Sequence, residues 1–439
     1  MRILKLLLIT AMILAAASAG AEEVIKKGEL LTLDRAVALA LKMQPDVLAA
    51  KGTVEMNSAR KRQAESAFWP QISASAGYSR VQPAGTSSAV RGLGASTSHS
   101  YDQYSTGASA QQMLFDFGRT WNQVSIQGRN VEASVSDLSG TENQVVLNTK
   151  QAYYNLLRAK RNRSVADETI RQYQQHLNQA KAFYEVGTRP RFDVTKAEVD
   201  LSNAKLNMIR SENAVRLAVV SLNNAMGIPD AQEYEVEDSL SFRKYDITLQ
   251  DAVATAYAER PELASINARR KAAEESVSLA KKGYFPILTG NAAWSWAGEN
   301  TGQFASGDGW NAGVSLSIPI FSGFLTKNQI SEAKANLYVL TENEESIRQG
   351  ILFEVQQNFL GLVEAEERIA VAELTVRQAT ENYEIASGRY NAGVGNPIEV
   401  TDAEVALSNA KTSHIQALYD YRTAVAGLEK AMGRRESLK

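Results

Sequence analysis

The segment YEVGTRPRFDVTKAEVDLSNAKL begins at Tyr184, and a near copy, YNAGVGNPIEVTDAEVALSNAKT, begins 206 positions later at Tyr390. Each copy reads as the end of one helix, a tight turn and the start of another helix. Gly187 and Gly393 can adopt the left-handed conformation that often ends a helix. The proline that follows each turn can open the next helix, whose first N–H groups have no partner within the helix. The doubled hairpin predicts two internal structural repeats.

The remaining sequence also pairs into two halves. LDRAVALALKMQPDV begins at Leu33, and LQDAVATAYAERPEL begins 216 positions later at Leu249. Each contains a proline that should kink or restart its helix. We therefore expect a first repeat over 22–227, a polar connection over 228–246 that forms a belt at mid-height, and a second repeat over 247–439.

Two very long helices are predicted, over about 118–187 and 324–392. At ~1.5 Å per residue, a helix of nearly seventy residues reaches roughly 100 Å, far beyond a globular core. Heptad spacing rich in small residues predicts coiled-coil packing against neighbouring helices. The heptad positions are Ala166, Ile170, Tyr173, Leu177, Ala180 and Tyr184, repeated as Ala372, Val376, Ala379, Tyr383, Ala386 and Tyr390. Shorter helices, expected over 33–66, 191–226, 249–282 and 398–432, would stack end to end along them.

Strands are predicted after two aromatic–proline stops, at 68–70 and 284–286, where the hydrophobic period changes from about 3.6 to 2. The expected strands cover about 71–82, 103–114, 287–298 and 309–320. Their length of ~9–11 residues and their alternation fit a membrane barrel, although a soluble sandwich is an alternative. Because four strands leave two open edges, which lipid does not tolerate, a membrane barrel would need strands from several chains.

Composition points to an exported protein. Residues 1–21 carry Arg2, Lys5 and a short apolar run ending in small residues, which predicts a cleaved signal peptide rather than a membrane anchor. Removing them takes away two positive charges, so the net charge of −2 becomes about −4, and no nucleic-acid partner is indicated. The chain has no Cys, which excludes disulfides, thiolate metal sites and a lipidated N-terminal Cys. No later apolar run approaches the roughly 20 residues of a spanning helix, so any membrane passage must use strands.

No catalytic constellation is evident. His99, His176 and His414 show no spacing suited to a metal site or a triad. The S-x-x-K pattern of serine acyltransferases occurs at 202–205, but it recurs so often in these Ser- and Lys-rich helices that chance explains it. Nucleotide-binding glycine loops are absent as well. We expect no enzymatic activity, no cofactor and no metal.

Acidic residues gather beside the two turns. Glu399 and Asp402 share one helical face, and Asp193 matches Glu399 in the first copy. In a single chain they would be solvated surface charges, whereas in a ring of chains they would converge near the axis.

These features together resemble the TolC-like outer membrane efflux protein family over essentially the whole mature chain. The most specific parts are the doubled Y-x-x-G-x-x-x-x-x-[DE]-V-T-x-A-E-V turn, the aromatic–proline entries to the strands, and LFDFG at 114–118 or IFSG at 320–323. The resemblance implies a mainly α fold with a β-barrel part. Three chains of four strands would form one twelve-stranded outer-membrane barrel, continuous with a periplasmic tunnel of antiparallel coiled-coil helices.

The resemblance also implies a function and its residues. The homotrimer would lie in outer-membrane lipid as the passive exit duct of a tripartite efflux or type I secretion system. A periplasmic adaptor protein and an inner-membrane pump of the RND, ABC or MFS type would recruit it, and the cargo stays open. A periplasmic coiled-coil scaffold without a channel is the alternative. The implied periplasmic gate comprises Tyr390, Glu399, Asp402 and Asp193. The expected adaptor-docking tip comprises Gly187, Thr188, Arg189, Gly393, Val394 and Gly395.

The sequence departs from the family pattern at one position of the tip. An arginine that tethers the closed tip in the best-known relative is matched here by Gly395, whereas the first copy carries Arg189. The closing network is therefore expected to be wired differently or to be looser.

Overall fold

The computed structural model describes residues 25–82, 100–231, 233–300 and 303–434. The predicted signal peptide, most of the first polar loop and the last five residues lie outside these ranges. The chain divides into two compact units, and each unit draws on both repeats. The first unit comprises 1–51, 137–263 and 347–439, and the second comprises 52–136 and 264–346.

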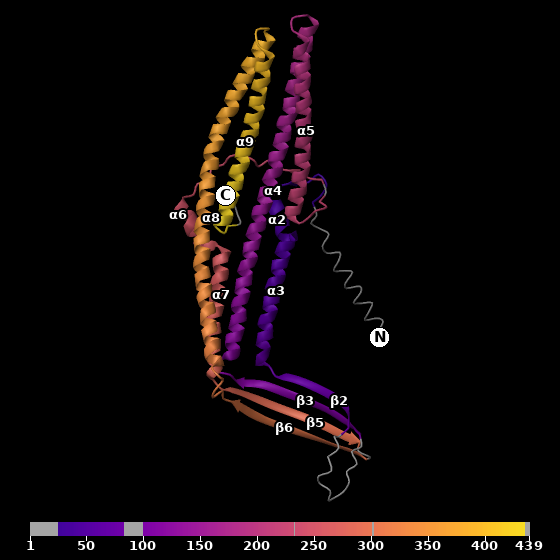
Figure 1. Ribbon diagram of the computed structural model, residues 1–439, viewed down its shortest axis with the longest axis vertical. Helices are drawn as coiled ribbons and strands as arrows, with labels where there is room; N and C mark the ends of the chain where they lie inside the picture. The colour runs from indigo at the N-terminus through magenta and orange to yellow at the C-terminus, as the bar shows by residue number, and fades with distance from the viewer. Residues whose placement is uncertain (1–24, 83–99, 232, 301–302, 435–439) are drawn as a thin grey trace. The chain divides into compact units, whose positions relative to one another are not determined.

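Four long helices run side by side in the first unit (Figure 1). They are the C-terminal parts of α4 (Arg119–Glu185) and α8 (Leu325–Asn391), together with α5 (Arg191–Met226) and α9 (Pro397–Ala431). Each of α4 and α8 has 67 residues, close to the predicted length. The mainly α fold with strands, predicted from the sequence, is confirmed.

The two shorter helices expected over 33–66 and 249–282 are each two helices. They are α2 (Leu33–Met43) with α3 (Pro45–Glu65), and α6 (Leu249–Glu259) with α7 (Pro261–Lys281). Each break falls at the proline, which opens the second helix of its pair. Thr32 and Thr248 cap α2 and α6, because their hydroxyls accept hydrogen bonds from the N–H groups of Arg35 and Asp251 at 3.2 and 3.1 Å.

The breaks between the short helices determine where the last helix of each repeat ends. Gly227 and Gly433 have φ of +74° and +83°. A Cβ on Gly227 would lie 2.8 Å from the backbone of Met43, and one on Gly433 would lie 2.8 Å from the backbone of Glu259. The repeated Ala-Met-Gly thus ends α5 and α9 where the chain packs directly against the α2–α3 and α6–α7 breaks.

The connection at 228–246 is tied to the helices of the first unit by two buried tyrosines. Tyr153 donates to the carbonyls of Leu31 and Glu237 at 3.0 and 2.8 Å. Tyr421 donates to the carbonyl of Arg243 at 2.8 Å. The connection is less irregular than expected, since β4 (Glu235–Val236) pairs in parallel with β1 (Leu30–Leu31).

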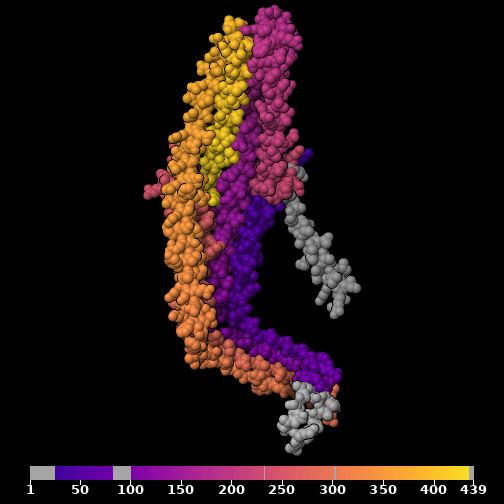
Figure 2. Space-filling view, in the orientation of Figure 1, coloured from indigo at the N-terminus to yellow at the C-terminus, as the bar shows by residue number. Residues whose placement is uncertain are grey.

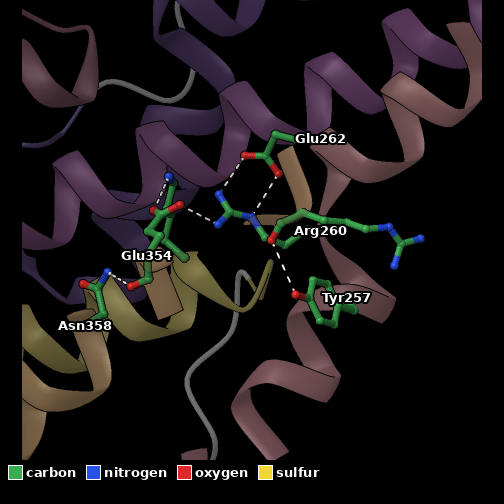
Figure 3. Close-up of polar contacts among 7 residues, drawn as sticks. Tyr257, Arg260, Glu262, Glu354 and Asn358 are labelled. Atoms are coloured by element: carbon green, nitrogen blue, oxygen red, sulfur yellow. Dashed lines mark hydrogen bonds and ion pairs between the residues drawn. The ribbon is translucent and has the colours of Figure 1, made fainter. Parts of the chain in front are cut away.

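A network of buried ion pairs links helices of the second repeat to one another within the first unit (Figure 3). Arg260, 5% exposed, donates to Glu354 at 2.5 Å and to Glu262 at 3.0 and 3.1 Å. Lys430 donates to the other oxygen of Glu354 at 2.8 Å. Burial opposes ionisation of Glu354, yet the hydrogen bonds from Lys430 and Arg260 keep its pKa below the ordinary value. Gln44 occupies the corresponding helix end in the first repeat, so this network belongs to one repeat only.

The second unit contains a four-stranded antiparallel sheet in the order β2–β3–β5–β6. Its strands are β2 (Gln71–Val81), β3 (Tyr101–Phe115), β5 (Ile287–Asn300) and β6 (Phe304–Ser317). The last strand differs from the predicted 309–320. It begins earlier because Phe304 pairs with Asn300, and it ends earlier because Pro319 cannot donate a ladder hydrogen bond.

The register gives the sheet two chemically different faces. One face carries apolar and aromatic side chains: Ile72, Ala74, Ala108, Ala110, Ala292, Trp294, Trp310, Ala312, Val314 and Leu316. The other face carries small and polar residues: Gln71, Ser73, Ser75, Gly107, Ser109, Gln111, Asn291, Ser295, Asn311 and Gly313. Within the described ranges, the edge strands β2 and β6 each pair with one strand only, so both edges of the sheet are open there.

Candidate functional site: the hairpin turns and the helices beside them

The two turns share one backbone design. Gly187 has φ of +73° and Gly393 has φ of +80°. Each N–H donates back into the preceding helix, to the carbonyls of Tyr184 and Tyr390 respectively, at 3.0 Å. In the described part of the chain, no atom lies within 4 Å of where a Cβ on either glycine would stand. The backbone conformation therefore favours glycine at both positions, and the space beside each glycine is uncovered in the described chain.

Arg189 joins the two turns. Its Nη2 donates to the carbonyl of Gly395 at 2.7 Å and to that of Gly393 at 3.3 Å. Its guanidinium carbon lies 5.7 Å from the centre of the Tyr390 ring. A Cβ on Gly395 would lie 2.6 Å from the backbone nitrogen of Tyr390, so the second turn excludes a side chain there. The arginine of the first turn thus bonds to the backbone of the second, which accounts for the departure at position 395.

Tyr390 is fully buried, with an exposed fraction of 0%. Its ring lies 5.0 Å from that of His176 and 5.5 Å from that of Phe183, both on α4. Its hydroxyl has no hydrogen-bond partner among the described residues. Tyr390 therefore packs between the two hairpins and does not form part of the solvent-exposed surface of the single chain.

The structure separates the three predicted acids. Asp193 is buried, with an exposed fraction of 6%. Glu399 and Asp402 are exposed on α9, and Glu399 lies 3.7 Å from the guanidinium of Arg389. Of the three carboxylates, only those of Glu399 and Asp402 are exposed to solvent in the single chain.

A polar cluster that was not predicted from the sequence lies between the hairpins. Asp200 accepts from Lys196 at 3.0 Å and from the hydroxyl of Thr401 at 3.3 Å. Glu404 is 1% exposed, and neither carboxylate oxygen has a hydrogen-bond partner among the residues described. A signal was available, because Glu404 follows Val400 by four positions and precedes Leu407 by three, within a buried helical stripe.

The residues that the structure describes were also searched for membrane-spanning helices and for metal sites. No helix there has the length and hydrophobicity needed to cross a bilayer. Within the same ranges, no group of three or more His, Asp or Glu side chains is placed to hold a metal ion.

Comparison with known proteins identifies the class. The family model described as Outer membrane efflux protein matches residues 36–228 and 252–434. Outer membrane protein TolC of Escherichia coli K12 is 25% identical over 348 residues, covering 75% of this chain and 69% of that protein. The TolC of Vibrio cholerae is 24% identical over 387 residues, covering 84% and 83%.

Solved structures show the same fold. The Campylobacter jejuni CmeC outer membrane channel matches with a TM-score of 0.77 at 19% identity, covering 91% of this chain and 85% of that chain. The open state of the Neisseria gonorrhoeae MtrE outer membrane channel gives 0.76 at 19% identity, covering 93% and 91%. The chain belongs to the outer membrane efflux protein family. The resemblance predicted from the doubled turn, and the outer-membrane class that it implied, are confirmed.

Proposed function

We propose that three copies of this chain form one outer-membrane channel, the passive exit duct of a tripartite efflux or type I secretion system. An adaptor protein and an inner-membrane pump would dock at its periplasmic tip, meaning the turns 187–191 and 393–397. The chain itself would perform no chemistry. The observation that carries the proposal is the sheet with one apolar face, one polar face and two open edges.

The two faces of the sheet fit the two environments of a barrel wall. The face with Trp294, Trp310 and Leu316 would meet lipid, and the face with Ser73, Gln111 and Asn291 would meet water in the lumen. Four strands cannot close a lumen, so the edges β2 and β6 would pair between chains. Three chains would supply twelve strands.

The helices support a ring of chains as well. Apolar side chains that the single chain leaves exposed follow α5 and α8 at roughly heptad spacing, and Figure 2 shows both helices uncovered in this view. They are Phe192, Val199, Leu206 and Val220 on α5, and Phe353, Leu360, Val371, Leu374 and Ile385 on α8. Such stripes favour helix–helix contact, here between α5 of one chain and α8 of the next. The alternative, a scaffold without a channel, leaves the apolar sheet face unexplained.

Cross-linking tests the shared barrel. The chain has no native Cys, so Ser75→Cys on β2 combined with Ser315→Cys on β6 gives one reactive thiol on each edge. Treatment of intact membranes with short thiol cross-linkers is expected to give a ladder ending at the trimer. The matched control, Ser105→Cys with Ala297→Cys, joins paired residues on the inner strands and should give only monomers. Monomeric product alone from the edge variant would rule out the shared barrel.

The exposed acids test the proposed gate. In a trimer, Glu399 and Asp402 would place six carboxylates near the tunnel mouth, where a narrow low-dielectric opening focuses their field. Replacing both with Ala is expected to lower the cation-to-anion permeability ratio in planar bilayers roughly twofold or more. An unchanged ratio would show that these carboxylates face away from the passage.

A further inference from the structure

The strongest unexplained feature is the buried carboxyl of Glu404. It lies on α9 within the first unit, 1% exposed, and neither of its oxygens has a hydrogen-bond partner among the described residues. A buried carboxylate without a partner is strongly destabilising, whereas a buried neutral carboxylic acid costs far less. The burial of Glu404 is therefore best explained by a bound proton.

Titratable groups on three neighbouring helices interact with Glu404. Asp200 on α5 acts on its carboxyl, and Tyr173 on α4 and Tyr383 on α8 are affected by its charge. Further charges lie next to these groups, since His176 on α4 interacts with Asp200 and Lys196, and Asp402 on α9 acts on Tyr173. Asp200 is already bonded to Lys196 and Thr401. The negative charge of Asp200 adds to the effect of burial, and together they raise the pKa of Glu404 to about 8.

The internal repeat shows that this burial is specific to one copy. Glu198 occupies the same place in the first copy, 206 positions earlier. Its side chain is 53% exposed and lies 3.8 Å from Lys181. Helical position and sequence motif are therefore the same for the two glutamates, and only the packing of the hairpins distinguishes them.

We propose that Glu404 is a proton-binding switch between the two hairpins: the packed arrangement holds its carboxyl protonated, and separation of the hairpins exposes it to water and releases the proton. This inference rests on the proposed function, in which the tip must open for cargo to pass. Proton binding and release is the only chemical step, and the proton moves between the Glu404 carboxyl and solvent.

The sign of the effect follows from linkage. The packed state holds the proton up to a pH of about 8, whereas an exposed glutamate loses it near 4.5. Between these values the packed arrangement loses stability as pH rises, and the opening equilibrium constant grows by up to about tenfold per pH unit per chain. His176 acts in the opposite sense, because burial lowers its pKa and charging it at acidic pH favours separation. His176 therefore contributes less between pH 6.5 and 8 than at acidic pH, and comparison with a variant that lacks the Glu404 carboxyl identifies the contribution of Glu404.

Glu404→Gln is the decisive variant, since glutamine has nearly the shape of the protonated acid and cannot titrate. In planar bilayers, the open-state occupancy of the wild-type channel should rise several-fold from pH 6.5 to 8, whereas that of Glu404→Gln should stay flat. Glu198→Gln, the matched control, should follow the wild type. A pH profile for Glu404→Gln identical to that of the wild type would overturn the inference.

Infrared spectroscopy of the purified protein provides a readout that does not depend on transport. The carbonyl band of a protonated carboxylic acid should be present at pH 6.5 in the wild type and in Glu198→Gln, and lost in Glu404→Gln. A wild-type protein that conducts no ions would contradict the proposed channel. Normal conductance without pH dependence, or a wild type without the band, would contradict the switch alone.

Discussion

Tryptophan in place of both Gly187 and Gly393 is expected to abolish export while the protein still forms trimers in the outer membrane. Both turns leave the space beside the glycine empty in the described chain, so a large side chain would project from the surface proposed for adaptor docking. Both residues also have positive φ, which adds strain of about 1–2 kcal/mol each for a residue with a Cβ. That strain is local to exposed turns and is small beside the stability of the long helices.

Accumulation of a transported dye, in cells that carry the cognate pump and adaptor, would measure export. The matched control replaces both glycines with Ala, which introduces the same backbone strain without the bulk and should retain most export. Efflux by the double tryptophan variant at the wild-type rate would show that the turns are not the docking surface. Loss of export in both variants would assign the effect to the backbone instead.

Lys150→Met is expected to cause the largest loss of stability. Nζ of Lys150 lies 2.6 Å from a carboxylate oxygen of Glu429, and the two side chains are only 7% and 2% exposed. Removing the lysine leaves the buried carboxylate of Glu429 without its ion-pair partner. Such a loss typically lowers the free energy of unfolding by about 3–5 kcal/mol. Denaturant unfolding of the solubilised protein, followed by circular dichroism, would measure it.

The control for this experiment is an exposed ion pair on the same helix. Arg171 and Asp167 lie 2.9 Å apart, with side chains that are 70% and 46% exposed. Arg171→Met should cost less than about 1 kcal/mol, because water screens the pair. Equal losses for Lys150→Met and Arg171→Met would mean that burial does not govern the Lys150–Glu429 pair.

The sequence predicted those parts of the fold that depend on local patterns. Heptad spacing predicted the seam of α4, and Tyr173, Leu177 and Ala180 are indeed buried against α5. The same pattern is wrong for Tyr184, which is 46% exposed because α4 ends at the following residue. The predicted strand boundary near 320 is also wrong, because β6 ends at Ser317 and Pro319 has no N–H to donate to a neighbouring strand.

The candidate site was harder to predict because it depends on which faces of the two hairpins pack against each other. Glu198 and Glu404 occupy equal positions in a repeated motif, yet only the second is buried. Likewise, Tyr390 is buried between the hairpins, whereas its counterpart Tyr184 is half exposed. No single-helix pattern distinguishes these pairs, since the difference comes from contacts between segments some two hundred residues apart.

The bond from Arg189 to the carbonyls of Gly393 and Gly395 makes the two turns of one chain chemically unlike. Three chains would present six turns that alternate between an arginine donor and a glycine acceptor. A partner assembly of six equal subunits would thus meet two kinds of binding site. Adjacent subunits of that assembly would have to bind in different ways. The turns of such a ring would therefore repeat with threefold rather than sixfold symmetry, and this would fix the rotational register of whatever assembles on it.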